Sequence, residues 1–294
     1  MSSTQLPAGD QIFLDHIGFF VRDVEGANAA LRRAGFAPAP ISIQVNPDPA
    51  GGAPRLTGTG NITAMLSQGY IEVLFKSADT PLAAELEAAA ARYGGLHLAA
   101  FAVADAPAAR RRLAGQGFRV RPLAKMERPV DNAGVAGTAA FTLARVEPGE
   151  MPEGRIQMLT HHTESMVWQP RWLSHPNGAL ALAGIVIAVG DVAEAAQRYA
   201  RFTGRTSRAT PFGETLALDR GHVDLVSADG FRRMLPEISL PSLPFIGACE
   251  IRVRSLAALA DMLEQQDIPA RRRHGMLVAE FPAEIGQGAW LFRE

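Results

Sequence analysis

The sequence predicts an α+β protein built from four copies of one unit, a βαβββ module. Four apolar, strand-like segments each run into an Asp or Ser of the kind that caps a helix. An alanine- and leucine-rich helical segment follows each cap, and in the first three copies a Gly stands just beyond it. Shorter strand-like runs then complete each copy. The recurrence of this order is a stronger signal than any single motif.

The first module begins with LDHIGFFVRDV, residues 14–24, in which side chains alternate between two faces as in a strand. Asp23 ends the strand and is a good N-cap for a helix over 25–33, which Gly35 closes. Further strands are expected over 37–45, 61–66 and 70–75, the last two as a hairpin. The Pro- and Gly-rich segment 46–60 is predicted to be a loop long enough to border a site.

The second module repeats the first with the same spacing, after a connecting helix over 82–93. Asp105 stands as far before Gly117 as Asp23 stands before Gly35, which indicates internal homology. The strands of this module are expected over 96–105, 119–123, 138–146 and 155–160.

The second half of the chain resumes the order after a break. The segment 161–180, HHTESMVWQPRWLSHPNGAL, interrupts the pattern and is expected to be a crossover. A third module starts at residue 182 with Asp191 as its cap, and a fourth starts at residue 247 with Ser255 as its cap. Their later strands are expected over 206–210, 214–218, 223–226, 269–273, 276–281 and 289–292. We therefore expect an N-terminal domain over 1–160, a linker over 161–180 and a C-terminal domain over 181–294.

Composition argues against several classes of protein. The 294 residues are 47% hydrophobic and can bury a large core, and 29 Lys and Arg balance 30 Asp and Glu, which gives no electrostatic support for a nucleic-acid or anionic-membrane partner. No segment approaches the roughly 18 apolar residues of a membrane span, and the N-terminus lacks the apolar core of a signal peptide. The single cysteine, Cys249, fits a reducing compartment, so a buried thiol and a cytoplasmic location are expected. Walker, GxGxxG, CxxC and GxSxG motifs do not occur.

Two strands carry a resemblance to a known family. The opening strand reads H-I-G-F-x-V-x-D, and residues 70–74 read Y-I-E-V-L. Together with the four modules they resemble the vicinal-oxygen-chelate superfamily, which includes glyoxalase I, extradiol dioxygenases and bleomycin-resistance proteins. Residues 168–179, W-Q-P-R-W-L-x-H-P-N-G-A, are similar to bacterial glyoxalase-like proteins of that superfamily. The resemblance implies that the modules pair into two domains, each a curved mixed sheet around a cleft, and it fixes fold better than activity.

The resemblance also implies a metal site in the cleft, held by the first and last strands of paired modules. In module one these positions are His16 and Glu72. An imidazole alone on an apolar strand is more often structural than a ligand. Glu72, however, lies on a strand that is apolar on both faces, where an unpaired carboxylate is costly. We therefore expect the two residues to act as a functional pair.

Module two departs from this pattern. The equivalent positions are Leu98 and Gln157, and His97 reaches the cleft only if a bulge intervenes, since one residue reverses the facing of a strand side chain. His161 shares parity with Gln157 and is an alternative ligand. The corresponding positions of the second half are Gly184, Asp224 and Leu291, so no metal set is expected there.

The leading hypothesis is a metal-dependent lyase or isomerase acting on a small oxygenated substrate. Two neighbouring substrate oxygens would chelate a divalent ion, which stabilises the enediolate formed on proton removal, with Glu72 as ligand and base. The ligand set suits Zn, Ni, Mn or Fe. A variant is an iron(II) extradiol dioxygenase that uses His16, His97 and Glu72. The competing class is a metal-free protein that sequesters a small molecule, as bleomycin-resistance proteins do, and the missing module-two ligands favour it.

The crossover admits two interpretations. Trp168, Trp172 and His175 either pack a connection that ends in an Asn-Gly turn or form a wall or lid over the substrate cleft. The four modules can complete their pairings within one chain or across two, so both a monomer and a homodimer fit the sequence.

Overall fold

The computed structural model describes residues 5–46, 48 and 50–294, and it confirms the α+β class. Module one consists of β1 (Ile12–Phe20), α1 (Val24–Arg33), β2 (Ser42–Asn46), β3 (Arg55–Met65) and β4 (Tyr70–Lys76). Module two consists of β5 (Gly95–Val103), α3 (Ala106–Gly115), β6 (Ala124–Asn132), β7 (Val135–Arg145) and β8 (Arg155–His161). The helix α2 (Pro81–Ala90) connects them.

The second half follows the same order after a crossover that contains α4 (Glu164–Val167) and the short helix η1 (Pro170–Trp172). Module three consists of β9 (Ala179–Ala188), α5 (Val192–Thr203), β10 (Ser207–Thr210), β11 (Gly213–Ala217) and β12 (His222–Val226). Module four consists of β13 (Phe245–Val253), α7 (Leu256–Gln265), β14 (Ala270–Arg273), β15 (Met276–Glu280) and β16 (Ala289–Arg293). Between them lies α6 (Ala228–Met234), a helix that the sequence patterns did not predict.

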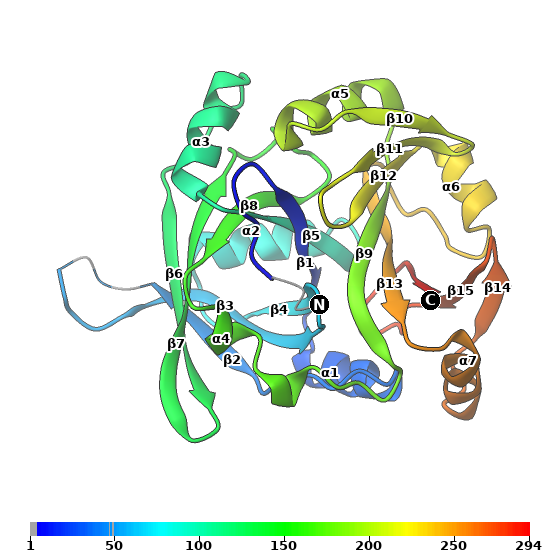
Figure 1. Ribbon diagram of the computed structural model, residues 1–294, viewed down its shortest axis with the longest axis horizontal. Coiled ribbons are helices and arrows are strands. Elements are labelled where there is room, and N and C mark those ends of the chain that lie inside the picture. Colours follow the sequence, from blue (N-terminus) through cyan, green and yellow to red (C-terminus); the bar gives the residue numbers. More distant parts are fainter. Residues whose placement is uncertain (1–4, 47, 49) are drawn as a thin grey trace.

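The two halves pair their strands differently. In the N-terminal half the order β1-β4-β3-β2-β6-β7-β8-β5 closes on itself, because β1 also pairs with β5, and the result is a barrel (Figure 1). In the C-terminal half the order β10-β11-β12-β9-β13 continues through β16 and β15 to β14 and stays open. The halves join where β5 meets β13, at the pair Leu96 and Ile246. The barrel therefore provides an interior that the open sheet does not.

Each module helix begins at the predicted cap. The side chains of Asp23, Asp105, Asp191 and Ser255 each accept a hydrogen bond from the backbone N–H three residues on. Such bonds satisfy one of the donors that a helix N-terminus leaves unpaired. The helices then cover the outer face of the sheet, where Ile17 and Phe19 of β1 share a core cluster with Ala27 and Leu31 of α1. The opposite face of β1 points into the barrel.

Two expected segments differ from the structure. The expected loop 46–60 is shorter, because β3 already begins at Arg55; positions 47 and 49 of that loop lie outside the described residues. The expected strand 119–123 is wrong, and the strand of that module is β6, over 124–132. β6 has a polar sequence interrupted by Pro129, so its residues give no apolar alternation to detect. It pairs with β7 around Ala133 and Gly134, which both have positive φ as tight hairpin turns require.

Cys249 is a buried free thiol, as expected, and burial raises its pKa well above the usual range. None of the described helices has the length and apolar character needed to cross a membrane.

Candidate functional site

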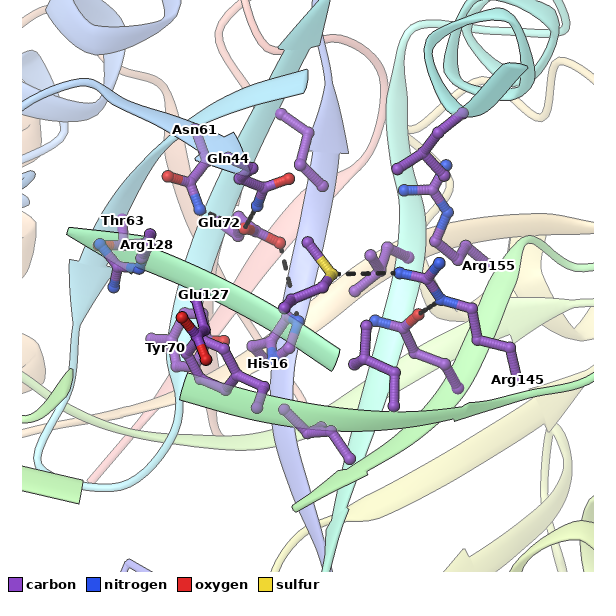
Figure 2. Close-up of a pocket in the computed structure, with 18 residues that line it drawn as sticks. His16, Gln44, Asn61, Thr63, Tyr70, Glu72, Glu127, Arg128, Arg145 and Arg155 are labelled. Atoms are coloured by element: carbon purple, nitrogen blue, oxygen red, sulfur yellow. Dashed lines mark hydrogen bonds and ion pairs between the residues drawn. The ribbon is translucent and has the colours of Figure 1, made fainter. Parts of the chain in front are cut away.

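A pocket of about 60 Å³ lies inside the N-terminal barrel and brings the two predicted functional residues of module one together (Figure 2). His16 reaches it from β1, Glu72 from β4 and Asn61 from β3. Module two contributes Leu98 and Gln157, among others. The pocket is therefore built by both modules, as expected for a paired-module cleft.

The pairing of β1 with β5 relates the two modules by an approximate twofold axis. Gly18 pairs with Leu98, and His16 pairs with Ala100. This reciprocal register makes His16 and Leu98 equivalent positions, as their equal separations from the caps predicted.

The last strands follow the same symmetry. Glu72 of β4 lies beside Gly18, and Gln157 of β8 lies beside Ala100, the residue equivalent to Gly18. Gln157 is therefore the module-two equivalent of Glu72, in agreement with the sequence count. Its Oε1 accepts a hydrogen bond of 2.9 Å from Arg145 Nε.

The His16 ring is held from two sides. Its Nδ1 lies 2.7 Å from Asp15 Oδ2, and its face stacks on Tyr70 with ring centroids 4.3 Å apart. Because a carboxylate only accepts, Nδ1 carries the proton and donates, which leaves Nε2 unprotonated in the neutral ring. This Nε2 lies 3.7 Å from Glu72 Oε2.

Glu72 is oriented by two amides. Its Oε1 accepts hydrogen bonds from Asn61 Nδ2 and, at 3.3 Å, from Gln44 Nε2. Its Oε2 has no hydrogen-bond partner among the described residues and faces His16. The amides thus leave one carboxylate oxygen available to the pocket.

Asp15 was not predicted from the sequence, and it links two histidines. Its fully buried carboxylate accepts from His16 Nδ1 and, at 3.0 Å, from His161 Nε2. Burial alone raises the pKa of Asp15, but the charge of His161 and the hydrogen bonds from both imidazoles outweigh it and hold the pKa far below the usual range. His161 packs against Trp168, with ring centroids 4.7 Å apart, and does not line the pocket. It supports His16 through Asp15.

The structure does not bring His97 to the pocket. The register between β1 and β5 skips His97, so the required bulge exists, and a matching bulge skips Asp15 in β1. The imidazole nevertheless turns away: its Nε2 lies 2.8 Å from the carbonyl oxygen of Tyr93, and its ring stacks on the Tyr93 ring. Burial lowers the pKa of His97 to about 4, so the ring is neutral at pH 7. The triad of His16, His97 and Glu72 therefore does not assemble.

Residues 14–203 match a family model described as a glyoxalase-like domain. The chain belongs to this glyoxalase-like family. The matched region includes the whole barrel pocket and the crossover. No curated protein matches the chain in sequence.

Several solved structures share this fold. A hypothetical protein from Staphylococcus aureus has a TM-score of 0.64 at 10% identity, over 96% of this chain and 99% of that one. A mutant of 4-hydroxymandelate synthase from Streptomyces coelicolor has a TM-score of 0.55 at 13% identity, over 97% and 93%. A Mn(II)-bound glyoxalase from Novosphingobium aromaticivorans has a TM-score of 0.52 at 12% identity, over 96% and 82%. At these identities the likeness concerns the fold.

The predicted cleft residues of the crossover do not line the pocket of this glyoxalase-like domain. Trp168 packs behind it, with its ring 6.0 Å from that of Tyr70. His175 accepts from the backbone N–H of Ala37 and donates to the carbonyl oxygen of Met65, at 3.0 and 2.7 Å. Trp172 lies under the guanidinium of Arg171. The crossover therefore supports the pocket wall from behind.

Three arginines line the pocket and were missed by the sequence analysis: Arg128 of β6, Arg145 of β7 and Arg155 of β8. Burial, with repulsion from Arg155 and Arg121, lowers the pKa of Arg145 to about 9. A polar residue in a strand is normally assigned to the solvent face, and β6 itself was not predicted. The sequence therefore contains no local signal that these arginines face an interior.

In the described ranges, no three or more His, Cys, Asp or Glu side chains form a ready set of metal ligands. Of the three such side chains that line the glyoxalase-like pocket, His16 and Glu72 lie close to each other, and Glu127 is the third.

The C-terminal half of the glyoxalase-like chain has a different arrangement at the corresponding place. Gly184 occupies the position of His16, and the imidazole of His222 on the adjacent strand covers it so closely that a Cβ on Gly184 would lie 2.3 Å from the ring. His222 Nε2 lies 3.5 Å from Asp224 and 3.9 Å from Glu250, which is paired with Arg293. These groups satisfy one another.

Proposed function

We propose that the barrel pocket is the active site of a metal-dependent lyase or isomerase that acts on a small substrate with two neighbouring oxygens. One observation carries the proposal: His16 Nε2 and Glu72 Oε2 face each other across 3.7 Å at the pocket wall. Among the described residues neither atom has a hydrogen-bond partner, so both retain lone pairs for a ligand.

The donor chemistry fits a divalent ion at two positions. When two ligand atoms each lie about 2.1 Å from the same ion, the distance between them is slightly shorter than the 3.7 Å observed here. His16 also has the usual support of a ligating histidine, because its other nitrogen donates to the carboxylate of Asp15. Imidazole with carboxylate suits Zn, Ni, Mn or Fe, and the same fold occurs in a Mn(II)-bound glyoxalase, which supports this class.

The chain's own residues would prepare the reaction. A bound divalent ion would act as a Lewis acid toward the two substrate oxygens. Asp15 fixes the tautomer and the direction of His16, while Asn61 and Gln44 hold one oxygen of Glu72. Glu72 would then serve as a ligand and as the general base toward a substrate carbon beside those oxygens.

A metal-free binding protein is the second candidate, and a specific observation favours it. At the module-two positions Leu98 offers no ligand, and the Gln157 oxygen is already engaged by Arg145. A dioxygenase of the two-histidine type would need His97, which bonds the Tyr93 carbonyl instead.

Metal analysis separates the two candidates. Protein purified without an affinity tag is stripped of metal, reloaded with Mn(II) or Zn(II), and measured by mass spectrometry for bound metal per chain. We expect about one ion per chain in the wild type, and retention only of background metal in His16→Gln. The matched control is His222→Gln in the C-terminal half, which should bind as the wild type does. A wild type that retains no ion would favour the metal-free binding protein, and an equal ion content in all three proteins would show that His16 does not hold the ion.

A further inference from the structure

We infer that the ligand of the barrel pocket carries an anionic group, a carboxylate or a phosphate, and that Arg145 and Arg155 bind it. This inference rests on the proposed function for the reacting end of the ligand, which faces His16 and Glu72. The anionic group lies at the opposite end of the same pocket.

The arginines form one side of the pocket. Arg145 and Arg155 come from the adjacent strands β7 and β8 and lie across the pocket from Glu72 and its amide partners (Figure 2). Arg128, on β6, adds a third guanidinium to the lining. Glu72 and Glu127 are the carboxylates of the lining, so its charged groups are mainly cationic.

These guanidinium groups have neutral partners. Within the described part of the chain, none of the three makes an ion pair with a carboxylate. Arg145 donates to the Gln157 amide oxygen and contacts the Met126 sulfur, and Arg155 lies over the Phe20 ring at 5.2 Å. By contrast, the nearby Arg121 pairs with two glutamates. A partly buried cation that contacts no carboxylate costs free energy, and an anionic ligand reduces that cost.

The surroundings of Arg145 point to the same conclusion. Burial and the neighbouring arginines depress its pKa to about 9, so the guanidinium is still charged at pH 7 but is destabilised by its setting. A bound anion opposes both effects.

The position of the two arginines also indicates how the ligand lies. Arg145 and Arg155 line a second, wider cavity of about 430 Å³ beside residues 147–154. They therefore stand at the junction of the two spaces. A ligand anchored there by its anion places a small oxygenated end toward His16 and Glu72 and leaves the wider cavity for further substituents.

Thermal unfolding with defined anions tests the inference. The wild type is melted in sodium phosphate, in sodium glycolate and in sodium chloride at equal ionic strength, and affinities are measured by calorimetry. One of the first two anions should raise the melting temperature above that in chloride, and which one does so distinguishes a phosphate from a carboxylate ligand. In Arg145→Gln and Arg155→Gln the affinity should fall about tenfold or more. Arg111→Gln, at an exposed helix position, is the control and should behave as the wild type.

The outcomes remain separable from those of the proposed function, because metal content is measured on the same samples. Anion binding that depends on Arg145 in a protein without metal would retain this inference and remove the metal-dependent enzyme. A metal-loaded wild type that neither anion stabilises beyond chloride would overturn the inference alone, as would equal stabilisation of the two arginine variants. Arg155→Lys keeps the charge, so it should retain part of the affinity if Arg155→Gln fails to fold.

Discussion

Asp15 determines which nitrogen of His16 faces the pocket. Its carboxylate lies between His16 Nδ1 and His161 Nε2, and its own position in a bulge of β1 turns it out of the regular alternation of the strand. Because of this bulge, two consecutive residues, Asp15 and His16, serve the same site. The equivalent bulge in β5 directs His97 toward the Tyr93 carbonyl oxygen instead. The same backbone irregularity therefore contributes to a site on one strand and to a packing contact on the other.

Glu72→Gln tests the role of the pocket carboxylate. The substitution preserves volume and removes the charge, so metal retention should collapse, while the apo protein should melt no lower than the wild type because an enclosed charge is costly without its ion. The measurements are metal stoichiometry and apo melting temperature. Glu250→Gln, which removes a carboxylate paired with Arg293 in the other half, is the control and should leave metal content unchanged. Unchanged metal in Glu72→Gln with a loss of about 3 to 5 kcal/mol in stability would assign Glu72 to the scaffold.

His97 gives the protein a defined acid sensitivity. The pKa of the buried ring is about 4 against 6.5 for an unperturbed histidine, so the unfolded chain takes up a proton over this window and the folded chain does not. Stability is therefore fully present above pH 6.5 and is lost as the pH falls toward 4. Urea unfolding at pH 7 and pH 4.5 measures the decrease in the free energy of unfolding between the two pH values. This decrease should be about 2 kcal/mol smaller in His97→Gln than in the wild type. His274→Gln, at an exposed turn, should lose as much as the wild type; equal losses in all three would contradict the assignment.

The pair His16 and Glu72 could be predicted because both stand out against apolar strands and match the family pattern. Asp15 could not, since its parity assigns it to the opposite face and only a bulge reverses that. The pocket arginines could not be predicted for a related reason. A strand that lines a polar barrel interior shows no hydrophobic alternation, so Arg128 and its strand resemble a surface loop in sequence.

At the scale of elements, the caps and the helices were the most predictable parts of the chain. An N-cap acts through residues three positions apart, so the sequence contains the whole interaction. α7, for example, begins directly after its predicted cap, Ser255. The strand β6 of module two and the helix α6 were not predicted, because both depend on contacts between distant segments that local sequence patterns do not contain.

Asp191→Ala tests the contribution of one such cap. The Asp191 side chain accepts from the backbone N–H of Glu194 at 3.0 Å, and its loss should cost about 1 kcal/mol, or about 2 °C in melting temperature for a chain of this size. Thermal unfolding followed by circular dichroism measures the shift. Asp261→Ala, an exposed change inside α7, should be neutral or slightly stabilising because alanine is the better helix former. A drop as large in Asp261→Ala would show that the effect is not one of capping.

At the scale of the molecule, the two halves are joined by a buried ion pair as well as by strand pairing. Arg198 of α5 contacts Glu153, which precedes β8, through two bonds of 2.8 and 2.9 Å, and Glu153 is fully buried. Both module pairs are completed within one chain, so the barrel site is complete without a second copy.

Glu153→Ala should weaken this junction. Removing the buried partner of Arg198 should cost about 3 kcal/mol, because the guanidinium keeps only the more exposed Glu194. Urea unfolding measures the loss. Glu194→Ala removes the other partner of the same arginine and should cost less than about 1 kcal/mol, since that pair is half-exposed. Similar losses in the two variants would mean that the junction does not depend on the buried pair.

The histidine that covers Gly184 has a consequence for the history of the chain. If the second half arose by duplication of the first, a reversion must place a histidine at 184, yet any Cβ there meets the His222 ring at 2.3 Å. The reversion at 184 therefore forces the His222 ring to move away from Asp224 and Glu250, and a change at 222 alone abandons the interactions with these carboxylates. Each of the two substitutions is destabilising on its own, so a return to the original histidine by single substitutions is disfavoured.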